Sequence, residues 1–161
     1  KVDIAFQSVG ELNPSYIARR ITTCTNKICA TAAYLQRWGM PKTPSDLIHH
    51  RVILNPYFGP QWHFEKGSNC IDIPVDGQFH CNNAVITRDA IKKGLGLGLL
   101  PSYAVDQDIQ SGALIEVLAD WSKPKSEIAA ITDNRHLSFL VKSFLDFSKK
   151  QLQRPILNKY E

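Results

Sequence analysis

The sequence has no apolar run approaching the roughly 18 residues that a membrane-spanning helix needs, so no membrane partner is expected. It also has no basic, apolar and cleavage-site pattern at its start, and nothing marks it for export. Its net charge is only +4, and its lysines and arginines are scattered, which argues against DNA binding by this chain itself. Because it begins on "KVDIAF", already strand-like and without an initiator methionine, we expect a piece of a longer polypeptide.

The cysteine spacing of a zinc knuckle or a thioredoxin motif is missing as well. The four cysteines are Cys24, Cys29, Cys70 and Cys81, and none stands in a CxxC pair. We expect free, mostly buried thiols in a reducing, cytoplasmic compartment, with a regulatory redox pair left open.

Catalytic and metal-binding patterns are equally scarce. There is no G-x-S-x-G elbow and no recognisable pair of acid and base carboxylates. His49 and His50 are adjacent and point apart, while His63 and His80 sit in separate alternating strands without an HxH or HxxxH spacing. The sequence therefore predicts no catalytic residue, no metal ligand, no cofactor and no enzyme activity.

What the chain does contain is short apolar strands alternating with helices, which predicts an α/β fold with largely parallel sheets. "WHFE" and "NCIDIPV", separated by "KGSN", predict an antiparallel hairpin. A short helix is predicted over "TAAYLQRWG", with Gly39 just past its end. An amphipathic helix is predicted over "NNAVITRDAIKK", capped by Asn82 or Asn83, and its apolar arc holds Ala84, Ile86, Thr87, Ala90 and Ile91. Another is predicted near the C-terminus, with Leu137, Leu140, Val141, Phe144, Leu145 and Leu152 on its apolar face and Pro155 after its end.

The stretch "KKGLGLGLLP" resembles a phosphate-binding loop only at first sight. A dinucleotide fingerprint has the order strand, glycines, helix, whereas these glycines follow a helix. We therefore predict Gly94 as a helix C-cap and Leu95 to Leu100 as a buried strand. Pro101 would start the next helix, and Gly96 and Gly98 would lie where another part of the chain approaches closely.

Ligands of open α/β sheets bind beyond the carboxyl ends of strands, where helix N-termini present N–H groups. Several polar residues stand directly after predicted strands or open predicted helices, which favours a small-molecule site, with an anion as one option. These residues are Gln7, Ser8, Thr31, Asn82, Asn83, Pro101 and Ser102.

Longer motifs, in order along the chain, carry a family resemblance. "KICATAAYLQRWGMPKTPSDLIHHRVI" and "NNAVITRDAIKKGLGLGLLPSYAVDQDIQSGALIEVLADW" are the most specific, and "VDIAFQSVGELNPSYIARRI", "WHFE" and "FLVKSFLDF" agree with them. Over about 150 residues the chain resembles the effector-binding domain of LysR-type transcriptional regulators.

The resemblance implies a type 2 periplasmic-binding-protein fold, with two α/β lobes and an effector cleft between them. Lobe I would comprise residues 1–30 and 121–155 and would be incomplete, lobe II would comprise residues 31–120, and residues 156–161 would form a tail. It further implies a helix-turn-helix elsewhere in the polypeptide that contacts DNA, and a homodimer or tetramer of the full-length protein. The effector would be a small molecule such as a carboxylate or an aromatic metabolite.

Effector contacts of the family fall here on Gln7, Ser8, Asn82, Asn83 and Pro101, and on the loop "NPYFGPQW". That loop adds Tyr57 and Phe58 as an aromatic surface. The alternative is a periplasmic solute-binding protein of the same fold, which would have an export signal and, usually, oxidised cysteines.

Overall fold

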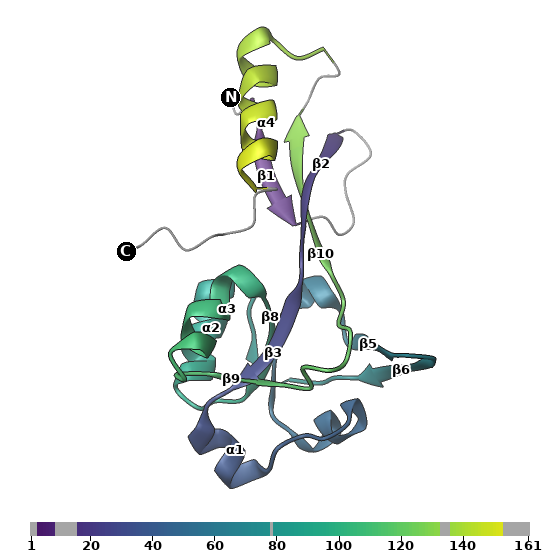
Figure 1. Cartoon of the computed structure of the whole chain (residues 1–161), viewed down its shortest axis with the longest axis vertical. Coiled ribbons are helices and arrows are strands. Elements are labelled where there is room, and N and C mark those ends of the chain that lie inside the picture. Colours follow the sequence, from purple (N-terminus) through teal and green to yellow (C-terminus); the bar gives the residue numbers. More distant parts are fainter. Residues whose placement is uncertain (1–2, 9–15, 78, 133–135, 153–161) are drawn as a thin grey trace. The chain divides into compact units, whose positions relative to one another are not determined.

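The structure is a computed structural model that describes residues 3–8, 16–77, 79–132 and 136–152. The chain divides into two compact units, one made of residues 1–24 and 126–161 and the other of residues 25–125. We call them unit 1 and unit 2 and describe each by itself (Figure 1). Within the described ranges, no helix combines the length and the hydropathy that crossing a membrane requires.

Unit 2 is built on a five-stranded sheet with the strand order β7-β4-β8-β3-β9. Strands β4, β7 and β8 are parallel to one another, whereas β3 runs antiparallel to its neighbours β8 and β9. The strands are β3 (Asn26–Ala30), β4 (Val52–Leu54), β7 (Phe79–His80), β8 (Leu97–Pro101) and β9 (Ile115–Val117). The remaining elements are α1 (Ala32–Trp38), the 3₁₀ helices η1 (Pro44–His49) and η2 (Pro56–Phe58), the hairpin β5 (Gln61–Lys66) and β6 (Asn69–Pro74), α2 (Ala84–Lys92) and α3 (Ser102–Gln110).

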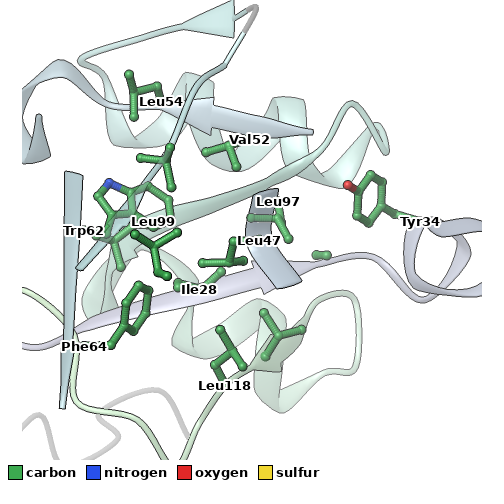
Figure 2. Packing of buried hydrophobic residues seen from close by; sticks show 14 of the residues in the cluster. Ile28, Tyr34, Leu47, Val52, Leu54, Trp62, Phe64, Leu97, Leu99 and Leu118 are labelled. Carbon is green, nitrogen blue, oxygen red and sulfur yellow. The ribbon is translucent and has the colours of Figure 1, made fainter. Parts of the chain in front are cut away.

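Both faces of this sheet are buried, and each is covered by other elements of unit 2. Successive side chains of a strand point to opposite sides, so one strand contributes to both cores. In β4, Ile53 packs toward α2 and α3 in a cluster that includes Ile91 and Leu100. Val52 and Leu54 join the larger cluster on the other face, which α1, η1 and the hairpin cover. Figure 2 shows Trp62 and Phe64 of β5 among the aliphatic side chains of that larger cluster.

Unit 1 contains a three-stranded antiparallel sheet of order β1-β10-β2, with α4 alongside it (Figure 1). Its elements are β1 (Ala5–Ser8), β2 (Ile17–Cys24), β10 (Ser126–Thr132) and α4 (Phe139–Leu152). Its small core holds Ile21, Ala130 and Leu145. The periodicity predicts Leu140, Phe144 and Leu152 on the buried face of this helix, but in the structure they are exposed.

Most local predictions for unit 2 are confirmed. α1 ends at Gly39, and the hairpin pairs Lys66 with Asn69 across Gly67 and Ser68. Gly67 has a φ of +61°, a conformation that glycine adopts without steric cost. Asn83 is the cap of α2, although Ile86, predicted on its apolar arc, is exposed.

Three expectations differ from the structure. Strand β3 pairs with β8 and β9, so it belongs to unit 2, and the boundary lies after Cys24 rather than after residue 30. The sheet of unit 1 is antiparallel rather than parallel. The thiols are all free, but only Cys29 is buried. Val2, Pro155 and the predicted tail over residues 156–161 lie outside the described residues.

Asp46 holds the start of η1. Its carboxylate Oδ2 accepts hydrogen bonds from the backbone N–H of Lys42 at 2.8 Å and of Thr43 at 2.9 Å. The N–H of Thr43, followed by that of Lys42, stabilises the charged form and lowers the pKa of Asp46 below its ordinary value of 3.8.

We expect Asp46→Ala to lower the free energy of unfolding at pH 7 by about 0.5–1 kcal/mol, as for the loss of a helix cap. Because the folded state holds the pKa down, this contribution is present above pH 3.8 and disappears as the pH falls through the folded-state pKa. Urea unfolding of the wild type and of Asp46→Ala, measured from pH 7 to pH 2.5, should therefore give free energies of unfolding that converge as the pH falls. Asp76→Ala, at an exposed carboxylate, is the control, and a pH-independent gap would contradict the role given to Asp46.

Candidate functional site

The candidate site lies at the edge of the unit 2 sheet where β4, β7 and β8 end, which we call the carboxyl edge. Parallel strands bring the residues that follow Leu54, His80 and Pro101 to this same edge. The hydrogen bond from Cys81 N to Leu54 O, at 3.0 Å, holds two of the strand ends together. In open α/β sheets this is the edge at which ligands bind.

An aromatic pair follows β4. Asn55 is buried, and its side-chain oxygen accepts a hydrogen bond from Tyr57 N at 3.0 Å, which starts the 3₁₀ turn. The rings of Tyr57 and Phe58 then meet edge to face, with centroids 5.1 Å apart. Both residues are half-buried, and Phe58 packs on the main core, so the pair is anchored and still presents surface to a ligand.

Two helices begin at the carboxyl edge. Asn83 caps α2 by accepting hydrogen bonds from Val85 N at 3.0 Å and Ile86 N at 3.1 Å, while Asn82 beside it is exposed. Pro101 precedes α3, and the N–H of Ser102 donates to Thr25 O at 2.9 Å. The first turns of both helices carry no charged side chain, so the positive ends of two helix dipoles act unopposed and favour an anion.

A cavity of about 220 Å³ opens beside Pro101, where β3 starts and β9 has ended. Lys27 donates to Asp106 at 3.0 Å and to Glu116 at 3.5 Å, and the hydrogen bond to Asp106 raises the pKa of its ammonium although burial opposes the shift. The ammonium of Lys123 lies 3.3 Å from Glu116. The cavity is lined by Thr25, Asn26, Lys27, Glu116, Ala119, Trp121, Ser122, Lys123 and Lys125, so cations outnumber anions in its wall.

The structure brings Tyr57, Phe58, Asn82, Asn83 and Pro101 to one edge, as the strand-end argument requires. Thr31 is not among them. It follows β3, which runs opposite to β8, so it lies at the other edge of the sheet, where it caps α1 through a hydrogen bond from Tyr34 N at 3.2 Å.

Gln7 and Ser8 belong to the other unit. They end β1, where they pair with Ala129 and Ile128 of β10, and Gln7 is exposed. Another cavity of unit 2, about 550 Å³ in volume, lies at the edge where the parallel strands begin, and its wall includes His50, Arg51 and Asp76.

Sequence reasoning missed Asn26, Lys27 and Trp121. The first two stand at the start of a strand, and only the reversed direction of β3 brings them to the carboxyl edge. Trp121 lies in "WSKPKS", which reads as a polar connector. An aromatic residue close to two lysines, Lys123 and Lys125, is the one local signal that could have pointed to a ligand.

A mixed sheet flanked by helices, with polar and aromatic residues gathered where its parallel strands β4, β7 and β8 end, is typical of α/β ligand-binding domains. The model of the LysR substrate binding domain matches residues 1–153, so the chain belongs to that family. Its fold is accordingly of the type 2 periplasmic-binding-protein class, as the resemblance implies.

The relatives in this family are transcriptional regulators. The chain is 24% identical over 163 residues to the probable HTH-type transcriptional regulator LtrA of Klebsiella pneumoniae, covering 98% of this chain and 52% of that protein. It is 30% identical over 130 residues to an uncharacterized HTH-type transcriptional regulator of Haemophilus influenzae, covering 79% and 45%. The chain therefore spans about half the length of the curated relatives it matches.

Solved structures agree with this assignment. The regulatory domain of CrgA, a LysR-type transcriptional regulator from Neisseria meningitidis, superposes with a TM-score of 0.77 at 25% identity, over 94% of this chain and 76% of that one. The regulatory domain of variant C227S AphB from Vibrio vulnificus gives 0.75 at 27% identity, over 92% and 76%.

Proposed function

We propose that this chain is the effector-binding regulatory domain of a LysR-type transcriptional regulator. The observation that carries the proposal is the family match over residues 1–153, joined by relatives that are themselves HTH-type regulators. DNA would be contacted by a helix-turn-helix elsewhere in the polypeptide, in the cytoplasm, by a homodimer or tetramer. Because the matching relatives are regulators, they favour this function over that of a periplasmic solute-binding protein.

The effector that the carboxyl edge favours is a small anion with an apolar part. Two helix N-termini and the lysines of the cavity attract a carboxylate, and the Tyr57–Phe58 pair offers a surface for a ring or an alkyl chain. The exposed Asn82 side chain can turn its NH2 group toward the ligand, whereas the amide of Asn83 is held in one orientation by the oxygen that caps α2.

The test is a panel of aliphatic and aromatic carboxylates, screened by thermal shift and followed by calorimetry on the hits. Asn82→Ala should lower the affinity for the best ligand by about tenfold, as expected for the loss of one hydrogen bond to a charged group. It should not lower the melting temperature of the protein. Asn69→Ala, an exposed asparagine in the hairpin, is the matched control. An unchanged affinity in Asn82→Ala would remove this residue from the site. A panel without any ligand would argue against a carboxylate effector.

Asn83→Ala is a weaker test of binding. It removes the cap that bonds two N–H groups of α2, so it costs about 1 kcal/mol of stability whether or not a ligand binds.

A further inference from the structure

The hairpin β5–β6 has one face buried in the core and one face exposed to solvent. On the exposed face, His63 and Glu65 are two residues apart on β5 and so point the same way. Directly opposite them on β6 stand Asp72, in register with His63, and Cys70, in register with Glu65. The strand pairing thus gathers an imidazole, a thiol and two carboxylates. No HxH or CxxC spacing in the sequence predicts this group.

The side-chain atoms of this group are close together. His63 Nδ1 lies 2.7 Å from Asp72 Oδ1, and His63 Nε2 lies 3.0 Å from Glu65 Oε1. The ligand atoms of His63, Glu65 and Cys70 all lie within 4.8 Å of one another. All four residues are exposed, so their side chains can rotate, while the buried Trp62 and Phe64 hold the strand beneath them in place.

His63 contacts more hydrogen-bond acceptors in this group than its neutral imidazole has donors. A neutral imidazole carries one N–H, yet both of its ring nitrogens face a carboxylate oxygen. When Nδ1–H donates to Asp72, Nε2 and the Glu65 oxygen face each other as two acceptors. A cation between them relieves this repulsion, either a second proton or a metal ion. The hydrogen bond to Asp72, followed by that to Glu65, accordingly raises the pKa of His63.

We propose that the exposed face of this hairpin is a zinc site. His63 Nε2, the Glu65 carboxylate and Cys70 Sγ bind Zn²⁺, and water completes the tetrahedron. Asp72 accepts the Nδ1–H bond and orients the imidazole, in the arrangement in which a carboxylate supports a metal-bound histidine. On binding, Cys70 gives up its thiol proton to solvent and His63 ligates in its neutral form.

The ligand set favours zinc over the hard cations. A nitrogen, a sulfur and an oxygen suit Zn²⁺, whereas Ca²⁺ and Mg²⁺ prefer oxygen ligands alone. Tetrahedral zinc with ordinary bond lengths sets its ligand atoms roughly 3.4 to 3.6 Å apart. The present upper separation of 4.8 Å therefore closes by rotation of exposed side chains, without a change in the backbone pairing. The site does not depend on the proposed regulatory function.

The experiment uses the whole chain, stripped of metal and kept reduced, with Zn²⁺ alone followed by calorimetry and Co²⁺ alone followed by absorption. The wild type should bind one equivalent of zinc and rise in melting temperature. Its cobalt form should show a thiolate-to-cobalt charge-transfer band. Cys70→Ser should lose the band, and His63→Gln and Asp72→Asn should each weaken zinc binding by at least about tenfold.

Matched controls separate this site from unspecific binding. Cys24→Ser and His49→Gln change a thiol and an imidazole outside the hairpin and should leave affinity, band and melting temperature unchanged. The proposal is overturned if the wild type binds no zinc, if Cys70→Ser binds as tightly as the wild type, or if the cobalt band survives in Cys70→Ser.

Discussion

Gly96→Ala is expected to lower the free energy of unfolding by about 3 kcal/mol, at the upper end of what overpacking costs. A Cβ at this position would lie 2.4 Å from the backbone carbonyl oxygen of Arg51. That oxygen accepts the hydrogen bond from Leu97 N at 2.9 Å, which starts the pairing of β8 with β4. The clash is with backbone, so relief requires the two central strands of unit 2 to move apart.

The matched control is Gly98→Ala, a buried glycine two residues further along. Its Cβ would meet the flexible end of Ile91 at 3.0 Å and the backbone oxygen of Ile53 at 3.3 Å. A side-chain rotation and a backbone shift of a few tenths of an ångström relieve these contacts, so a cost of about 1 kcal/mol is expected. Urea unfolding followed by circular dichroism measures both. A cost at Gly98 equal to or above that at Gly96 would refute the close approach of β8 to Arg51. No nucleotide binding is expected of the wild type or of either variant, because these glycines lie in and beside a strand rather than in a phosphate-binding loop.

Phe64→Ala is expected to cost about 3 to 5 kcal/mol, the range for removing a buried phenylalanine ring. Phe64 is fully buried in the larger core cluster of unit 2, which also contains Ile28 and Leu99 (Figure 2). The hairpin that carries it is a two-stranded sheet, which is marginal in water unless one face packs on a core. Loss of this ring therefore also loosens β5 and β6.

Gln61→Ala is the control for that substitution, since it removes an exposed side chain from the same strand and should change stability by less than about 0.5 kcal/mol. Chemical denaturation of the three proteins gives the comparison. If Phe64→Ala behaves like Gln61→Ala, the hairpin is not part of the core that stabilises unit 2.

Helix ends and turns could be predicted from the sequence wherever a residue type favours one backbone conformation. Gly39 ends α1, Asn83 caps α2, and the Gly67–Ser68 turn closes the hairpin, because each feature depends on only a few neighbouring residues. The polar positions at the carboxyl edge were readable for the same reason, since helix starts carry their own cap signals.

Long-range pairing was not readable. The reversed direction of β3 depends on its partners β8 and β9, some 70 to 90 residues further along the chain, and it decides that Asn26 joins the carboxyl edge while Thr31 does not. Strand β2 went unrecognised because it contains two arginines and two threonines, and its apolar residues do not alternate regularly with polar ones. The group around His63 exists only through cross-strand register, which no spacing along one strand reveals.

The hydrogen bond from the Asn26 side chain to Pro124 O, at 2.5 Å, has a consequence for the order of folding. It joins residues next to the two ends of unit 2, which is a continuous stretch with its own core, so this stretch can fold first. Unit 1 must instead pair β2 with β10, and Cys24 with Ser126, across a loop of about 100 residues. Closing such a loop in a free chain costs about 4 kcal/mol in entropy. Prior folding of unit 2 removes most of that cost, so the inserted stretch acts as an internal template that brings the two distant halves of unit 1 together.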